Sequence, residues 1–155
     1  MKEERHITAA LGYLELGMFE EAVEELHCLP VERLGHPGIL QLESTIQIRG
    51  GHYEQALEIS THLCQVSPDN PMPWLDRAFC LHELQRTEEA KACLLKGPDC
   101  LKQEATYYYN LGCYEAQLGS LDRAHHYLEK AVNMDASFLI TAKTDPDLAP
   151  LYDAI

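Results

Sequence analysis

The sequence predicts an all-α fold built from four consecutive helical hairpins. Four similar strings recur along the chain: GMFEEA from Gly17, GHYEQA from Gly51, QRTEEA from Gln85 and GSLDRA from Gly119, each 34 residues after the one before. From residue 7 to residue 16, apolar residues recur at intervals of three and four, which is typical of an amphipathic helix. No segment shows the sustained alternation of a strand. A fixed period of this length indicates a repeated pair of helices.

The expected helices follow in chain order from this pattern and its breaks. The breaks are GHPG at 35–38, GG at 50–51, SPDNPMP at 67–73 and KGPD at 96–99, where glycine and proline end helices. The eight helices are therefore expected at residues 3–16, 19–29, 37–49, 52–66, 72–84, 87–96, 102–118 and 121–133. Thr87 and Ser120 are predicted N-caps, because a hydroxyl there accepts an unpaired backbone N–H.

The C-terminal tail, SFLITAKTDPDLAPLYDAI, predicts one or two further short helices. Asp145 is expected as the N-cap and Pro146 as the first helical residue, a position where proline is well tolerated. Leu148, Leu151 and Ile155 form an apolar edge of this segment. Two roles are open for it: a cap over the apolar side of the last hairpin, which we favour, or a switchable ligand lying in a groove.

A small residue stands halfway along the first helix of each hairpin: Ala10, Ser44, Ala78 and Gly112. Together with the 34-residue period, these positions resemble the tetratricopeptide repeat family over most of the chain. The resemblance implies an α-α superhelix (solenoid) of four antiparallel hairpins plus a C-terminal capping helix. We expect a single domain, 1–155, with repeats at about 3–36, 37–70, 71–104 and 105–138 and a capping tail at 139–155.

Two slots depart from the repeat pattern. A large apolar group near the start of the first helix is present as Leu40, Trp74 and Tyr108, but the first repeat has His6. A terminal repeat tolerates this change because its outer face meets water. A later slot holds Tyr13 and Leu81 in the first and third repeats, but Gln47 and Glu115 in the others. Repeats two and four are therefore expected to pack less tightly there.

Composition and charge narrow the class of partner. The chain has 12 Lys and Arg against 25 Asp and Glu, a formal net charge of -13, which repels nucleic acid and anionic membranes. The first residues carry no signal-peptide h-region, and no window approaches a membrane span, so a cytoplasmic protein is expected. The six cysteines include no CxxC pair, and we expect buried free thiols.

The resemblance implies a peptide-binding groove lined by the first helix of each hairpin. Arg49 and Asn110 lie near the groove and are candidates for fixing ligand direction. Phe79 and Tyr109 are the strongest candidates, because aromatic side chains supply large contact area at little entropic cost. For Leu11 and Ile48 the alternative is packing against a neighbouring helix. The inferred lining comprises Ile7, Leu11, Gln41, Thr45, Ile48, Leu75, Phe79, His82, Tyr109 and Cys113.

These features predict a non-catalytic module that binds a peptide or helix of a partner protein, as a monomer or weak homodimer. Some family members clamp acidic chaperone tails with Lys, Asn and Arg, but Ile7, Leu11, Leu42, Met72 and Asp76 stand at the clamp-like positions here. A ligand with neutral or basic flanks therefore fits better. The alternatives are a type III secretion-like chaperone, although Met1 to Glu4 leaves no room for its usual helical lead, and a self-associating structural protein.

No catalytic, cofactor or metal site is expected. Cys113 with a groove histidine lacks a third orienting group or an oxyanion donor, and no phosphate-binding loop is present. His62 with Cys64, Cys80 with His82, and the adjacent His125 and His126 have spacings that point ligands to different faces of a helix.

Overall fold

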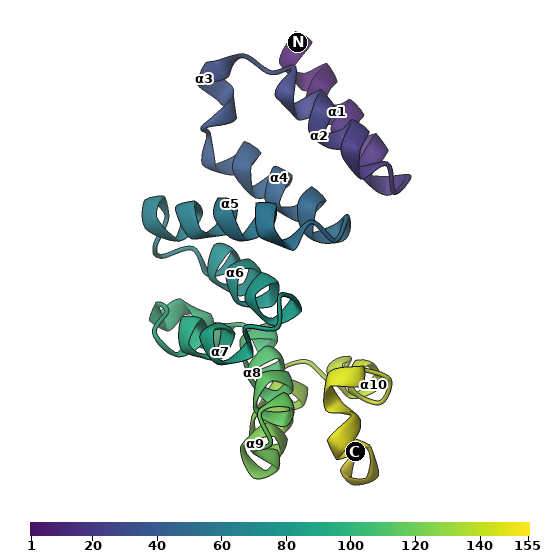
Figure 1. The fold of residues 1–155 in the computed structure, drawn as a ribbon, viewed down its shortest axis with the longest axis vertical. Coiled ribbons are helices and arrows are strands. Elements are labelled where there is room, and N and C mark those ends of the chain that lie inside the picture. The colour runs from purple at the N-terminus through teal and green to yellow at the C-terminus, as the bar shows by residue number, and fades with distance from the viewer. The chain divides into compact units, whose positions relative to one another are not determined.

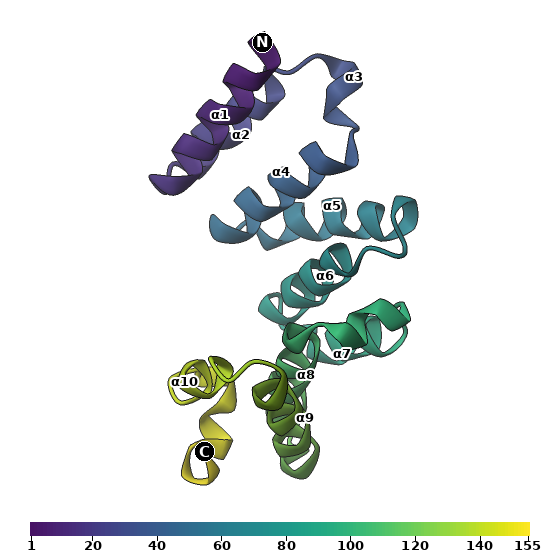
Figure 2. The same cartoon turned by 180° about the vertical axis from the view of Figure 1, so that it is seen from behind.

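The computed structural model describes residues 1–155, and all its regular elements are helical (Figures 1 and 2). Two short helices, α3 (Val31–Leu34) and the 3-10 helix η1 (Asp99–Gln103), lie in connections. The tail forms α10 (Phe138–Ala142) and the 3-10 helix η2 (Pro146–Ala154). The hairpin helices are α1 (Lys2–Glu15), α2 (Phe19–His27), α4 (Pro37–Arg49), α5 (Tyr53–Val66), α6 (Pro71–Glu83), α7 (Thr87–Leu95), α8 (Ala105–Gln117) and α9 (Leu121–Met134).

All eight predicted hairpin helices are present, and most of their ends agree within two residues. The predicted start of α8 at residue 102 is wrong, because Asp99–Gln103 forms η1 and α8 begins at Ala105. The chain divides into two compact units, Met1–Pro68 and Asp69–Ile155. The first contains the hairpins α1–α2 and α4–α5, and the second contains α6–α7, α8–α9 and the tail.

The small residue of each first helix is buried at the crossing of its hairpin. Ala10, Ser44 and Ala78 are fully buried. At Gly112 an added Cβ would lie 3.3 Å from the Ala124 carbonyl oxygen and 3.4 Å from the Leu128 nitrogen. The backbone of α9 thus passes directly over α8, which leaves room only for a small side chain in this slot.

The turn inside each hairpin depends on one residue in the left-handed conformation. The φ angles are 72° at Gly17, 75° at Gly51, 64° at Gln85 and 85° at Gly119, so the period of the sequence is also a period of the backbone. The next N–H bonds back to a carbonyl five residues earlier, as from Arg86 to Leu81 at 2.8 Å. This pattern is the Schellman ending of a helix, in which glycine is preferred.

The capping predictions are partly wrong. Arg86, not Thr87, is the N-cap of α7, and the Thr87 hydroxyl instead lies 2.9 Å from His82 Nδ1. Ser120 is the N-cap of α9, but its side chain makes no capping bond. Neither α7 nor α9 therefore has a side-chain hydrogen bond from its N-cap residue.

The expectation of looser packing at Glu115 is also wrong. Its side chain is 1% exposed, and one carboxylate oxygen lies 2.8 Å from Lys91 Nζ, which is 20% exposed. The other oxygen lies 3.9 Å from Arg123 Nε. An ion pair between α7 and α8 therefore replaces apolar packing in this slot.

Replacing Gln85 with glycine is expected to raise the free energy of unfolding by about 0.5–1 kcal/mol, because relief of left-handed strain exceeds the entropic cost of glycine. Urea unfolding followed by circular dichroism measures this. Gly119→Ala is the matched control, since its Cβ would meet nothing within 4 Å. It should be destabilising by about 1 kcal/mol through backbone strain alone. A neutral Gly119→Ala would contradict this account.

Lys91→Met is expected to destabilise the chain by about 3 kcal/mol, because it leaves the buried Glu115 carboxylate without its closest partner. Urea unfolding again supplies the measurement. The double variant Lys91→Met, Glu115→Gln should recover most of the lost free energy of unfolding, since no buried charge then remains. A single variant as stable as the double would show that the pair is energetically unimportant.

Candidate functional site

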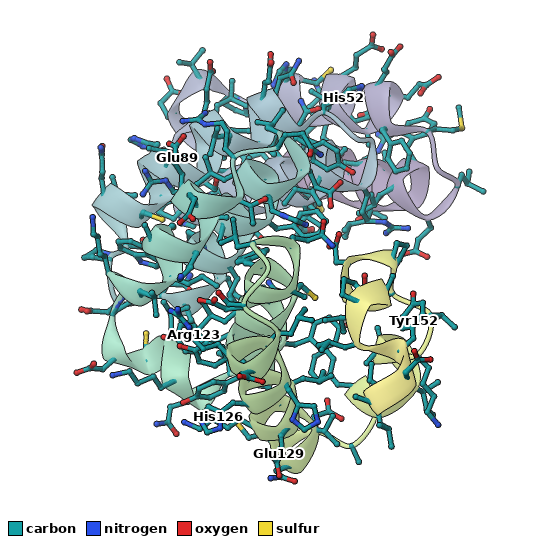
Figure 3. The ribbon with its side chains drawn as sticks, turned by 60° about the horizontal axis from the view of Figure 1, so that its bottom comes forward. His52, Glu89, Arg123, His126, Glu129 and Tyr152 are labelled. Atoms are coloured by element: carbon teal, nitrogen blue, oxygen red, sulfur yellow. The ribbon has the colours of Figure 1, made fainter.

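The tail of the second unit lies against α8 and α9 (Figure 3). As predicted, Asp145 is the N-cap of η2 and Pro146 is its first residue. Asp145 Oδ1 accepts the Asp147 N–H at 3.0 Å, and the Tyr152 hydroxyl donates to the Asp145 carbonyl at 2.6 Å. The two aspartates are therefore held by bonds within the tail as well as by their contacts with the helices.

Polar side chains of α6 and α8 bind these aspartates. The Tyr109 hydroxyl donates to Asp145 Oδ2 at 2.6 Å, and His82 Nε2 lies 2.8 Å from Asp147 Oδ2. The Gln117 amide donates to the Asp147 carbonyl at 2.8 Å. Cys113 Sγ lies 3.7 Å from Asp145 Oδ2. We call His82, Tyr109, Cys113 and Gln117 the tail-binding face.

Apolar contacts accompany this polar network. Leu148 is fully buried and Leu151 is 5% exposed, while the Tyr109 and Phe138 rings stack at a centroid distance of 4.6 Å. Burial of Leu148 and Leu151 is expected if the tail caps the last hairpin. Polar contacts with His82 and Tyr109 are expected if the tail acts as a ligand of these helices. The tail has both features.

Burial raises the pKa of two groups of the tail-binding face, the Tyr109 phenol and the Cys113 thiol. It raises the pKa of the Tyr109 phenol well above its usual range, and the hydrogen bond to Asp145 adds to the effect. Burial also raises the pKa of the Cys113 thiol, with Asp145 and Asp147 adding unfavourable negative charge. Both groups are therefore neutral at physiological pH, Tyr109 as a donor and Cys113 as an unreactive thiol.

The structure brings together three of the predicted groove residues, His82, Tyr109 and Cys113, beneath the tail. Leu75 is buried in the same unit, whereas Phe79 and Asn110 are half-buried. Sequence reasoning missed Asp145 and Asp147 as contacts. The D-P-D spacing was the available signal, but only the fold shows what these carboxylates meet.

The predicted lining of the first unit has a different character. Leu11 is 45% exposed, and Arg49 is exposed at the end of α4. Ile7 packs on the core of the unit. The half-buried Thr45 donates its hydroxyl to the Gln41 carbonyl within its own helix. Ile48 is half-buried.

The prediction that all cysteines are buried is wrong for Cys28, which is exposed just beyond α2, and Cys100 is intermediate. The other four thiols are buried, and all six are free. For Cys80, burial raises the thiol pKa to about 12, with Asp76 and Glu83 contributing.

No helix in the structure combines the length and the apolar character needed to cross a lipid bilayer.

These features define the chain as an all-α helical-repeat protein. One model of the tetratricopeptide repeat matches residues 47–111, and a second matches residues 105–138. The chain belongs to the tetratricopeptide repeat family. Members of this family are generally non-catalytic modules for protein interaction, so the partner class is another protein.

Solved structures agree with this assignment of the fold. A thermophilic tetratricopeptide repeat protein of Thermus thermophilus is 20% identical with a TM-score of 0.79, covering 98% of this chain and 82% of that one. MamA from Desulfovibrio magneticus RS-1 is 19% identical with a TM-score of 0.76, covering 92% and 80%. At these identities the likeness establishes the fold alone. No protein of curated function matches the chain significantly by sequence.

Asp147→Ala is expected to loosen the tail, because it removes the carboxylate that binds His82. Amide hydrogen exchange of residues 146–154 should accelerate about fivefold, equivalent to about 1 kcal/mol for a charged hydrogen bond that is partly exposed. Asp153→Ala, at an exposed position of the same segment, is the control. Equal exchange in the two variants would mean that the His82 contact does not hold the tail.

Proposed function

We propose that this chain is a non-catalytic protein-interaction module that binds a segment of a partner protein along the faces of its first helices. The observation that supports this most directly is a segment of the chain itself, Asp145–Leu151, bound to the tail-binding face. A surface that binds one short segment through side-chain donors and buried leucines has the chemistry required to bind another.

The tail contacts define the chemistry of a suitable ligand in the second unit. The Asp145 carboxylate accepts a hydrogen bond from the Tyr109 hydroxyl, and the Asp147 carboxylate, two residues later, lies beside His82 Nε2. Leu148 follows directly in the sequence. The net charge of -13 opposes further acidic residues in the ligand. A short D-x-D-L-like segment with neutral or basic flanks is therefore the preferred ligand.

The bound tail makes partner binding in this unit competitive. A tethered segment acts at an effective concentration of about millimolar, so an untethered peptide must displace it or wait for it to open. The first unit offers a face of another kind, where Leu11 and Arg49 are exposed.

The same groups do not favour catalysis. The raised pKa of the Cys113 thiol keeps it protonated, whereas a nucleophilic cysteine requires a thiolate. His82 is engaged on both ring nitrogens, by Thr87 and by Asp147. Its role in this arrangement is to position the bound segment.

A labelled synthetic peptide with the sequence of residues 144–155 tests the proposal. It should bind the Asp145→Ala, Asp147→Ala variant, whose own tail is weakened, at least about tenfold more tightly than wild type, where the tethered tail competes. Fluorescence anisotropy measures both affinities. A peptide with both aspartates changed to asparagine is the control and should bind weakly to either protein.

Absence of peptide binding to the variant, with its helical circular dichroism intact, would contradict the proposal for this face. A further Tyr109→Phe substitution in the same variant should reduce peptide binding, because it removes only the hydroxyl donor. Light scattering of the wild-type chain distinguishes exchange of tails between two chains, since such exchange predicts a concentration-dependent dimer that the Asp145→Ala, Asp147→Ala variant weakens.

A further inference from the structure

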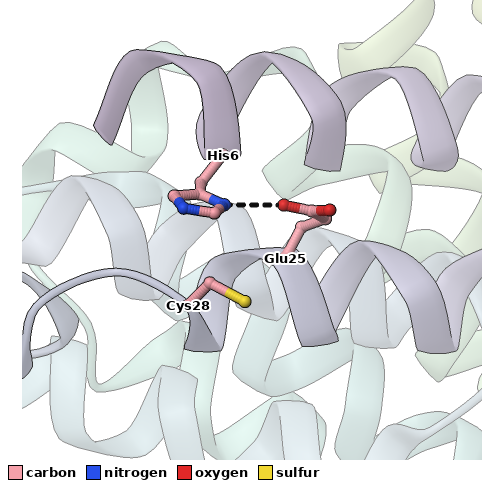
Figure 4. Close-up of side chains that lie close together, drawn as sticks. All are labelled: His6, Glu25 and Cys28. Carbon is pink, nitrogen blue, oxygen red and sulfur yellow. Dashed lines mark hydrogen bonds and ion pairs between the residues drawn. The ribbon is translucent and has the colours of Figure 1, made fainter. Parts of the chain in front are cut away.

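Three potential metal ligands meet within the first hairpin. His6 projects from α1, and Glu25 and Cys28 lie one turn apart at the end of α2 (Figure 4). His6 Nδ1 lies 2.7 Å from Glu25 Oε2, and one ligand atom from each residue lies within 4.8 Å of the other two. The three side chains point into the same space between the helices.

Comparison with the other repeats shows that this cluster is specific to the first hairpin. The positions 34, 68 and 102 residues later hold Leu40, Ile59 and His62, then Trp74, Cys93 and Lys96, then Tyr108, Tyr127 and Lys130. In those repeats the first two positions are apolar, aromatic or thiol-bearing.

The fourth hairpin shows that these three positions form one contact point. Tyr108 and Tyr127 stack at a centroid distance of 6.4 Å, and Lys130 Nζ lies 5.2 Å from the Tyr108 ring centre. The equivalent contact in the first hairpin replaces two aromatic rings by an imidazole and a carboxylate and adds a thiol. The first hairpin lacks an aromatic pair at this contact point, and all three of its positions carry groups that can bind a metal ion.

The donor set has a preferred ion. Imidazole nitrogen, thiolate sulfur and carboxylate oxygen together suit Zn²⁺, which binds them at about 2.0–2.3 Å in a tetrahedron. Ligand atoms around such an ion lie about 3.3–3.8 Å apart. His6 and Glu25 are 32% and 29% exposed and Cys28 is exposed, so rotation of these side chains is sterically available.

The surroundings permit entry of an ion. A cleft of about 260 Å³ opens onto His6 and Glu25 and is also lined by Lys2, Arg5 and Ala9. The cations of Lys2 and Arg5 oppose a dication in this cleft, whereas Glu25 and a coordinating thiolate together offset the charge of zinc.

We propose that His6, Glu25 and Cys28 form a zinc site that joins α1 to α2 in the first hairpin. Three protein ligands and one water complete the tetrahedron. The second cluster of this kind, Cys113 with Asp145 and Asp147, does not suit an ion, because Tyr109 and His82 already bind its carboxylates. The zinc site is independent of peptide binding by the second unit.

Zinc affinity of the untagged, full-length chain tests the proposal. A chromogenic chelator competes for Zn²⁺ under reducing conditions, and Cys28→Ser, Glu25→Gln and His6→Leu are compared with wild type. Wild type should bind one equivalent, and each variant should bind at least about 100-fold more weakly, since even outer-sphere changes cost about 10- to 100-fold. His6→Leu introduces the residue of the second repeat and should preserve folding.

Cobalt supplies a second readout. Co²⁺ bound by wild type should show a thiolate-to-metal charge-transfer band that Cys28→Ser abolishes and that the control Cys100→Ser retains. His125→Gln, outside the cluster, should leave zinc affinity unchanged. A wild-type zinc affinity no greater than that of the three single variants, or an undiminished charge-transfer band in Cys28→Ser, would overturn the proposal.

Discussion

The close approach of two helices within each hairpin is the constraint on which the rest of the structure depends. Ala10, Ser44, Ala78 and Gly112 allow it, and in the last hairpin the α9 backbone lies 3.3 Å from where a Cβ at Gly112 would stand. The left-handed residue at each turn returns the chain at the angle that this approach requires. Because both features repeat every 34 residues, equivalent positions of different hairpins meet the same neighbours and can be compared directly.

Comparing equivalent positions of the four hairpins shows where the side chains of individual repeats differ. The slot of Glu115 combines burial with charge and is stabilised by Lys91 from the preceding helix. The contact point of Tyr108 and Tyr127 in the last hairpin is occupied by His6 and Glu25 in the first. A hairpin that keeps its small residue and its turn tolerates different chemistry elsewhere, since the backbone geometry no longer depends on those side chains.

The tail shows how a short segment gains specificity on such a scaffold. Leu148 and Leu151 supply buried area, but apolar burial alone does not fix register. The bonds of Asp145 and Asp147 to Tyr109 and His82 do so, because a hydrogen bond requires a particular carboxylate to lie beside a particular side chain. A shifted register would leave the Tyr109 hydroxyl and His82 Nε2 beneath the tail without these partners, and this cost disfavours other registers.

The sequence by itself determined the hairpins, because period, small residues and turn signals are local and every repeat reinforces them. It also identified Asp145 as an N-cap, which depends only on its neighbours in the chain. It placed His82, Tyr109 and Cys113 on one face, but it did not show that the tail covers them, nor that His6 meets Glu25 and Cys28. Those contacts join residues 19 or more positions apart, and Asp145 and Asp147 lie 36 and 65 residues from their partners. Only the tertiary structure decided them, because the packing of helices against each other, not any local propensity, brings such side chains within bonding distance.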